Sequence, residues 1–450
     1  MNNALLIKNG TIVTTEKIFK ADLLSKNGII EMIEETIAAK PEYEIIDASG
    51  LHVMAGVIDP QVHFREPGHE WKEDLFSGSR AAASGGVTTF LDMPNNKPSI
   101  TTVELMSMKK KLASEKSIVN YNFFIGATKD NLEALNRVEN VAGIKIFMGS
   151  STGDLLVNNP DDLLKIFETG NKLIAVHSED DDIIKSNYEK YFVDESSDFS
   201  IHSQIRSPEA AMKTTQLACR LSFKFKRRLH ILHVSTENEV NFLKCLPPNT
   251  VISAEVCPQH LLLNGPEVYE KLGSLAQMNP PLRERHHSIG LWKGLKEGTI
   301  QCIATDHAPH TMAEKSQLYG KAPSGMPGVE TSLPLMLNEV RKGNASLNDI
   351  TKWMSEAPAR LYGIVNRGKI EIGYNADLVI VDLKLEKTVQ NGALMTKVNW
   401  SPYHGQTLTG WPVTTIVNGN IVFNKGKIIE GNLGQEVNID PELVLRFKSL

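Results

Sequence analysis

The sequence has few cysteines and no long apolar run. Its cysteines, Cys219, Cys245, Cys257 and Cys302, show no Cys-x-x-Cys spacing in a chain of 450 residues. A disulfide framework is therefore not expected, and a reducing compartment fits. No stretch of about 18 apolar residues is present, so no membrane-spanning helix is expected. The start, MNNALLIKNGTIV, lacks the basic residues and apolar run of a signal peptide, so we expect a cytoplasmic protein.

An excess of charge of one sign is also missing. The formal net charge is −5, with 48 basic and 53 acidic residues that are well mixed along the chain. There is no basic stripe of the kind that binds nucleic acid, and no acidic tail. We therefore expect neither a nucleic-acid partner nor a membrane partner. The hydrophobic content of 41% is ordinary for a globular protein and is enough for a large core.

What is present in the middle of the chain is a regular alternation of predicted strands and helices. Apolar segments of strand length recur at 54–59, 87–93, 121–127, 143–149, 172–177, 229–235, 251–257 and 301–307. Segments with helical periodicity, such as 103–117 and 208–225, separate most of them. Eight buried strands that alternate with helices predict a (β/α)8 barrel of the TIM type over residues 53–364.

The two chain ends have a different texture, with short strands and turns. The Asn-Gly pairs at 9–10 and 27–28 are typical of hairpins. The C-terminal part repeats this texture, for example in 413-VTTIVNGNIVFNKGKII-429. Because chain ends often lie close together, we expect residues 1–52 and 365–450 to form one small β-sandwich domain.

Polar side chains stand where the predicted barrel strands end, which is where catalytic groups of such barrels lie. They are Asp59, Gln61, His63, Arg65, Asp92, Asn95, Lys145, His177, His233 and Asp306. Histidines and carboxylates are common ligands of zinc. A single histidine at a strand end is more often a hydrogen-bonded core residue than a ligand. Several at successive strand ends favour a metal site on one face of the barrel.

Lys145 lies inside the apolar run GIKIFMG. Burial of an ammonium group is costly and lowers its pKa, which makes the neutral amine accessible. Such an amine can add CO2 to form a carbamate, whose two oxygens can bridge two metal ions. The alternative is a lysine that extends toward solvent or pairs with a carboxylate. The residues alone leave both interpretations open.

Asp306 is the acidic residue of the motif 304-ATDHAPH-310. Near a metal and a water molecule, its carboxylate could act as both ligand and proton shuttle. The alternative is a helix N-cap at the end of the last barrel strand. His310 could face a substrate, and His307 could orient Asp306.

Taken together, the motifs resemble those of dihydroorotases, within the amidohydrolase superfamily of cyclic amide hydrolases. The matching motifs are 63-HFREPG-68, 92-DMPNN-96, 233-HVSTENEV-240, 254-AEVCPQHLLL-263, 278-MNPPLR-283, 304-ATDHAPH-310 and 322-APSGMPGVET-331. The resemblance covers almost the whole chain. It implies reversible closure of N-carbamoyl-L-aspartate to L-dihydroorotate and water, in pyrimidine synthesis.

The resemblance also implies roles for individual residues. It implies one or two Zn2+ ions on His63, Lys145, His177, His233 and Asp306, with Lys145 carbamylated and Asp306 catalytic. It implies substrate contacts from His63, Arg65, Asn95, Asn279, His310, Ser324 and Gly325. Arg65 presents a planar fork that suits a carboxylate, which hydantoinase substrates lack. Members of the family are often dimers or larger, so we expect a homo-oligomer.

Gln61 departs from the family pattern, in which a histidine usually stands at this position. Gln61 could bind metal through its amide oxygen, which is a weaker ligand than imidazole. One metal position could instead be weak or empty, or the chain could be a non-catalytic partner subunit. Arg65, Asn95 and Asp306 are all retained, which favours catalysis. A hydantoinase or dihydropyrimidinase-like cyclic amidase is the alternative within the same class.

Overall fold

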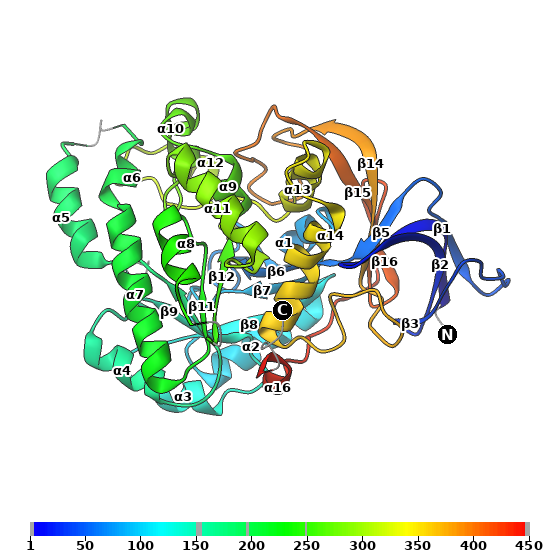
Figure 1. Ribbon diagram of the computed structural model, residues 1–450, viewed down its shortest axis with the longest axis horizontal. Helices are drawn as coiled ribbons and strands as arrows, with labels where there is room; N and C mark the ends of the chain where they lie inside the picture. Colours follow the sequence, from blue (N-terminus) through cyan, green and yellow to red (C-terminus); the bar gives the residue numbers. More distant parts are fainter. Residues whose placement is uncertain (1–3, 150–154, 195–197, 248–249, 446–450) are drawn as a thin grey trace.

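The computed structural model describes residues 4–149, 155–194, 198–247 and 250–445. Its larger part holds eight parallel strands that follow one another in chain order (Figure 1). They are β6 (Val57–Val62), β7 (Val87–Asp92), β8 (Asn120–Gly126), β9 (Gly143–Phe147), β10 (Ile174–His177), β11 (Leu229–Ile231), β12 (Ile252–Val256) and β13 (Cys302–Ile303). The predicted barrel of eight strands is confirmed.

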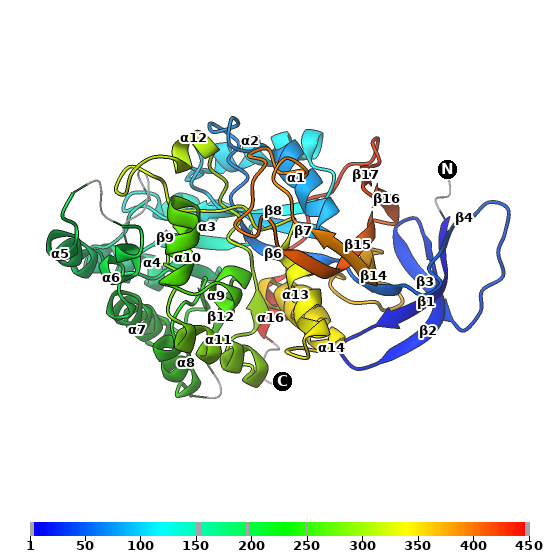
Figure 2. The same cartoon turned by 90° about the horizontal axis from the view of Figure 1, so that it is seen from above.

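Helices cover the outside of the barrel (Figures 1 and 2). Two of them, α2 (Val103–Lys116) and α7 (Pro208–Phe225), confirm the predicted helical segments. In α7 the buried residues Ala211, Thr215 and Ala218 recur at spacings of three and four, which turns one face toward the strands. No helix of the described residues is both long enough and apolar enough to cross a membrane.

The remaining helices follow the strands in sequence. They are α1 (Leu75–Ser84), α3 (Leu132–Arg137), α4 (Pro160–Glu168), α5 (Asp181–Tyr191), α6 (Ile201–Ile205), α8 (Glu237–Lys244), α9 (Pro258–Leu262), α10 (Glu267–Leu272), η1 (Gly273–Ala276), α11 (Arg285–Glu297), α12 (Met312–Lys315), α13 (Ser332–Arg341), α14 (Leu347–Thr351), η2 (Lys352–Glu356), α15 (Ala357–Tyr362) and α16 (Pro441–Leu445).

Strands from both chain ends form a second sheet, at the right of Figures 1 and 2. It contains β1 (Ala4–Val13), β2 (Ile18–Lys26), β3 (Ile29–Glu34), β4 (Glu44–Asp47), β5 (His52–Ala55), β14 (Leu378–Thr388), β15 (Thr407–Val417), β16 (Asn420–Asn424) and β17 (Lys427–Ile428). Strand β5 joins the two ends, because it pairs with β1 on one side and with β14 on the other. The expected small β-domain is therefore present as one continuous hydrogen-bonded sheet, and its boundaries at 52 and 365 stay a prediction.

Two local predictions are corrected. The segment 54–59 is not one strand, because β5 ends at Ala55 in the terminal sheet and β6 begins at Val57 in the barrel. Gly56 separates them, and a Cβ there would lie 2.2 Å from Thr88. The pair Asn27-Gly28 is the predicted hairpin turn, but Asn9-Gly10 is a bulge inside β1.

Buried Asp59 connects the last strand of the barrel to the first. The backbone N–H and the hydroxyl of Thr305 donate to its carboxylate at 3.1 and 2.6 Å. Burial raises the pKa of Asp59 to about 7. Further along, the N–H of His63 donates to the carbonyl of His307 at 2.8 Å. These contacts bring the carboxyl ends of β6 and β13 together, and the site residues with them.

Candidate active site

The barrel brings the six predicted metal ligands together at the carboxyl ends of its strands. They are Gln61, His63, Lys145, His177, His233 and Asp306, and these residues are between 1% and 7% exposed. Direct contacts link Asp306 to both Gln61 and His63, and His177 to His233. The register of β9 and β10 sets Lys145 beside Ala175, which faces the same side of the sheet as His177.

His177 and His233 form a neutral pair of imidazoles. The Nε2 of His177 lies 2.8 Å from the Glu179 carboxylate, which only accepts, so this nitrogen carries the proton. The lone pair of His177 Nδ1 therefore faces His233 Nε2 at 3.1 Å. Burial lowers the pKa of His177, and burial together with His177 and Lys145 holds the pKa of His233 well below its usual value. The Nδ1 of one neutral ring therefore lies against the Nε2 of the other.

Glu179 is a site residue that the sequence interpretation missed. Burial alone would raise the pKa of Glu179, but Arg206 and His177 lower it to about 2. Arg206 Nε donates to Glu179 Oε2 at 3.0 Å, and one terminal nitrogen of Arg206 lies 2.7 Å from the same oxygen. Glu179 stays ionised and fixes the orientation of His177. Its place two residues after His177 was the available signal, whereas nothing in the sequence pointed to Arg206.

Lys145 is buried in β9, and its Nζ lies 4.5 Å from the centre of the Phe147 ring. Burial lowers the pKa of Lys145 to about 7, although the Asp306 and Glu255 carboxylates act to raise it. A large share of neutral amine near pH 7 follows from this pKa. The lysine therefore meets the condition for carbamate formation that the sequence suggested.

Gln61 is held by Asp306. Its amide nitrogen donates to Asp306 Oδ1 at 2.9 Å, which is the orientation that a carboxylate allows. The amide oxygen of Gln61 is buried and has no hydrogen-bond partner among the described residues. Gln61 therefore orients Asp306 through its amide nitrogen, and its neutral amide oxygen remains without a partner among the described residues.

His63 connects Asp306 to Asn95. Its Nδ1 lies 2.6 Å from Asn95 Oδ1, and its Nε2 lies 3.0 Å from Asp306 Oδ1. If Nδ1 donates to the Asn95 oxygen, a neutral ring has a lone pair at Nε2 that faces the carboxylate. Such a pair of acceptors repels unless a proton or a cation lies between them.

Three residues of the site have backbones in the left-handed region. Arg65, His233 and Asp306 have φ values of 65°, 36° and 46°. L-residues seldom adopt these angles, and such strain is concentrated at active sites. Each of these residues follows the end of a barrel strand, so the strained backbone turns the side chain toward the centre.

The predicted substrate side is built around Arg65, which is 8% exposed. Its Nε donates to the carbonyl of Pro309 at 3.2 Å, and one terminal nitrogen lies 3.1 Å from His310 Nε2. Burial lowers the pKa of Arg65 only to about 10, so it remains a cation at neutral pH. Asn95 also lies at this site, because its Oδ1 contacts His63 Nδ1.

Buried polar residues hold the rest of this side. His202 Nε2 lies 2.9 Å from Asn279 Oδ1, and burial lowers the pKa of His202 to about 3, so a neutral ring fixes Asn279. Lys315 donates to the carbonyls of Gln277, Pro323 and Gly325 at 3.1, 2.8 and 3.1 Å, and the last two residues flank Ser324. The polar sequence around Lys315 gave no sign that it is buried.

The sequence also predicted roles for Gly325 and His307. Gly325 has a φ of 136°, and a Cβ there would lie 2.6 Å from the carbonyl of Ala308, so glycine is required. His307 does not orient Asp306, because its Nδ1 accepts from Gly328 N and its Nε2 lies 3.5 Å from Glu73. Gln61 and His63 contact Asp306 instead.

The donors present fit a zinc ion. The His177 and His233 nitrogens are 3.1 Å apart, close to the roughly 3.3 Å that two ligands of one tetrahedral zinc have. The facing acceptors of His63 and Asp306 and the unpartnered oxygen of Gln61 also suit a cation. Glu179 supplies the carboxylate that commonly orients a metal-binding histidine.

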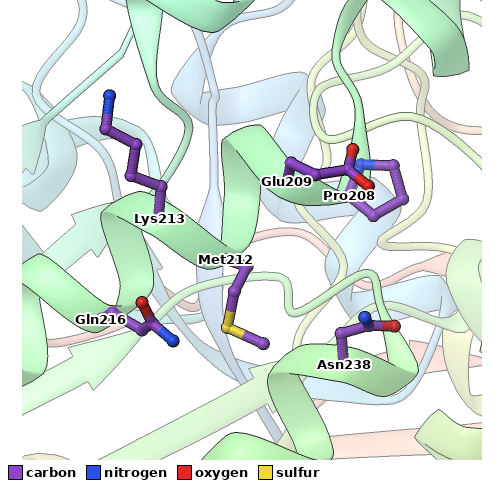
Figure 3. A pocket seen from close by; sticks show the side chains of 6 residues that line it. All are labelled: Pro208, Glu209, Met212, Lys213, Gln216 and Asn238. Carbon is purple, nitrogen blue, oxygen red and sulfur yellow. The ribbon is translucent and has the colours of Figure 1, made fainter.

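The presence of a surface pocket does not by itself identify the active site. A pocket of about 190 Å³ lies on α7 and α8. Figure 3 shows the side chains that line it, which are Pro208, Glu209, Met212, Lys213, Gln216 and Asn238. It contains no histidine and none of the predicted site residues. The chemistry lies instead among the buried side chains at the strand ends.

Comparisons with known proteins agree with this geometry. The model of the amidohydrolase family matches residues 52–422. A protein named dihydroorotase from Methanosarcina acetivorans is 34% identical over 449 residues and covers 95% of each chain. A dihydroorotase from Lactobacillus acidophilus is 33% identical over 94% of this chain and 99% of its own.

Among solved structures, an L-hydantoinase (dihydropyrimidinase) from Arthrobacter aurescens superposes with a TM-score of 0.92. It is 29% identical and covers 97% of this chain and 100% of its own. The resemblance to dihydroorotases and their cyclic-amidase relatives is confirmed. The chain belongs to the amidohydrolase family, and its similarity over nearly the full length groups it with the dihydroorotases of that family.

Proposed function

We propose that this protein is a zinc-dependent dihydroorotase, which interconverts N-carbamoyl-L-aspartate and L-dihydroorotate. The observation that carries the proposal is the buried Arg65 guanidinium, which lies beside His310 and is close enough to Asp306 for their charges to interact. A fixed, planar cation there suits the carboxylate that distinguishes dihydroorotate from uncarboxylated rings. Proteins named dihydroorotase at 34% identity support the same substrate.

The side chains divide the reaction between them. Arg65, Asn95 and His310 would hold the substrate carboxylate, and the segment at Ser324 and Gly325 would lie along the ring. In hydrolysis, water attacks the ring amide carbon while Asp306 takes its proton. The carbon–nitrogen bond then breaks, and Asp306 returns the proton to the leaving nitrogen. Ring closure follows the same steps in reverse.

Zinc would be held by Lys145, His177 and His233, together with His63 and Asp306. When bound, it supplies a Lewis acid that activates water and polarises the amide carbonyl. The low pKa of Lys145 supports its carbamylation by CO2. Because Gln61 offers only an amide oxygen, we infer one firmly held ion and a weaker second position. We also propose a cytoplasmic homo-oligomer.

A hydantoinase-like activity is the second candidate, because the L-hydantoinase structure matches closely. Replacement of Arg65 separates the two activities. Arg65→Ala should reduce turnover of dihydroorotate by roughly two orders of magnitude, since it removes a charged, buried partner of the carboxylate. Turnover of dihydrouracil or hydantoin should be unaffected. Loss of dihydrouracil or hydantoin turnover with dihydroorotate turnover unchanged would favour the hydantoinase.

The test of the proposed function is dihydroorotate hydrolysis by the purified protein. The absorbance of the ring is followed before chelation, after chelation and after zinc is added back. Activity that disappears with the chelator and returns with zinc is the expected result. A folded, zinc-loaded protein that turns over no dihydroorotate would contradict the proposal and favour a non-catalytic subunit.

A further inference from the structure

Lys72 lies at the edge of the predicted carboxylate site, beside His310. It follows β6 in the same loop as Arg65, and its side chain is 13% exposed. Its Nζ lies 2.8 Å from Glu314 Oε1 and 3.0 Å from Nδ1 of His310. The ammonium group thus contacts a residue of α12 and the imidazole beside Arg65.

These contacts determine which nitrogen of His310 carries the proton. An ammonium group only donates hydrogen bonds, so His310 Nδ1 must accept from Lys72 and cannot carry a hydrogen. The proton of a neutral ring is then on Nε2. That nitrogen lies 3.1 Å from the carbonyl of Ser324, which only accepts. Lys72 and Ser324 therefore select the same tautomer from opposite sides of the ring.

The charge around His310 keeps the ring neutral. Burial holds the pKa of His310 well below its usual value, and Arg65, Lys72 and Lys315 lower it further. A ring with hydrogens on both nitrogens would place a third cation between Arg65 and Lys72. The neutral form with the proton on Nε2 avoids this repulsion and satisfies both neighbours.

The tautomer has a consequence for Arg65. Its terminal nitrogen lies 3.1 Å from His310 Nε2, and a guanidinium only donates. If Nε2 had a lone pair, the imidazole would accept from Arg65 and occupy the donor. With the proton on Nε2, this ring offers Arg65 no acceptor, so the donor can turn to a substrate carboxylate.

We propose that Lys72 is a positioning residue that sets substrate affinity, because it fixes the His310 tautomer and so keeps Arg65 available for the carboxylate. This inference rests on the proposed function, since it assigns the carboxylate of dihydroorotate as the group that Arg65 binds. Lys72 itself touches neither the reacting atoms nor the predicted metal ligands.

A simpler role for Lys72 would be to tether its loop to α12 through Glu314. A variant at Glu314 distinguishes this tethering role from the tautomer role. Glu314 accepts from Lys72 and also from the N–H and hydroxyl of Thr311, which begins α12. Glu314→Gln removes the ion pair and leaves Lys72 able to donate to His310. Lys72→Met removes both interactions, and Lys72→Arg restores a cationic donor. Only the tautomer role makes the glutamine variant much milder than the methionine variant.

The experiment measures kcat and KM for dihydroorotate with the zinc-loaded wild type and these three variants. We expect Lys72→Met to raise KM by roughly ten- to a hundredfold, the usual effect of a hydrogen bond to a charged group. Its kcat should stay within about threefold, and its melting temperature within a few degrees. Lys72→Arg should recover most of the affinity, and Glu314→Gln should keep KM within about threefold. Equal losses in Glu314→Gln and Lys72→Met, or an unchanged KM in Lys72→Met, would overturn the proposal.

A second readout does not depend on activity. In protein with 15N-labelled histidine, long-range proton–nitrogen correlation spectra show which ring nitrogen is protonated. The His310 signal is assigned by its loss in His310→Gln. The wild type should carry the proton on Nε2, and a proton on Nδ1 would overturn the proposal. If the wild type hydrolyses no dihydroorotate, the proposed function fails, and the spectra of the wild type and Lys72→Met together then decide whether Lys72 fixes the tautomer.

Discussion

The two halves of the predicted metal centre are organised differently. On the side of β9, β10 and β11, the neutral rings of His177 and His233 bring two nitrogens to 3.1 Å from each other, and Glu179 fixes the His177 ring through its other nitrogen. On the side of β6 and β13, Gln61 donates to Asp306 and His63 Nε2 lies 3.0 Å from the same carboxylate, while His63 Nδ1 contacts Asn95. The first half is arranged to bind a cation. The second half is arranged to hold a carboxylate in position.

The difference explains how the chain can tolerate glutamine at position 61. An amide can orient Asp306 as well as an imidazole can, because either group presents an N–H to the carboxylate. It cannot replace imidazole as a zinc ligand of equal strength. We therefore expect the loss of the usual histidine to weaken one metal position and to leave the proton transfer by Asp306 intact.

The largest effect is expected at Asp306, in the half that moves the proton. Asp306→Asn should lower kcat by about 10²- to 10⁴-fold, the usual contribution of a general acid–base group. Its zinc content should stay near that of the wild type, because His177 and His233 remain. Metal analysis and steady-state kinetics on the same sample measure both. If zinc were lost along with activity, the assignment of separate roles to the two halves would be wrong.

A smaller effect is expected when the other half is loosened. Glu179→Gln removes the charge that fixes His177, so zinc affinity should fall by about 10- to 100-fold. Competition with a chromophoric chelator measures this affinity. Asp182→Asn is the matched control, because Asp182 is an exposed residue of the neighbouring helix α5 and should change nothing. Equal affinity in Glu179→Gln and the wild type would show that Glu179 does not support a metal ligand.

Gln61→His should make the two halves more alike. A histidine at position 61 supplies the imidazole that the family usually has, so bound zinc should rise by about one ion per chain. Elemental analysis after removal of loose metal gives the count. An unchanged count would mean that the geometry of β6, and not the residue type, limits the second position.

The pH dependence of carbamylation tests the half that contains Lys145. Only the neutral amine adds CO2, and the pKa of Lys145 is lowered to about 7. At constant dissolved CO2, the initial rate should therefore rise only about twofold from pH 7 to pH 9. A lysine with an ordinary pKa would show a rise of roughly a hundredfold over the same range. The carbamate formed from 13C-labelled CO2 is followed by NMR, and the steeper rise would contradict burial as the activating cause.

Much of this organisation could be predicted because it depends on patterns of buried strands. The eight apolar segments gave the barrel, and the strand-end rule then brought distant residues such as His63 and Asp306 to one face. Gly56 lies where the first predicted strand divides into β5 and β6. Because the residues on both sides of Gly56 are apolar, the sequence pattern did not predict this division.

The supporting polar residues could not be predicted in the same way. Arg206 and Lys72 stand in polar segments that are typical of exposed loops, and their partners Glu179 and Glu314 lie far away in the sequence. Lys315 also stands in a polar segment, although two of its carbonyl partners lie within ten residues of it. Their burial comes from the packing of loops after the strands, which periodicity does not describe. His307 shows the opposite error, because its neighbour in sequence, Asp306, is not its partner in space.

The most direct test of the account is a zinc titration of metal-free protein, with bound zinc and dihydroorotate turnover measured on the same samples. We predict that turnover reaches its plateau when about one zinc is bound per chain, because the His177 and His233 side fills first. A plateau that requires about two zinc ions would contradict the assignment of a weak second position. A protein that binds zinc and stays inactive at every ratio would contradict the proposed dihydroorotase itself.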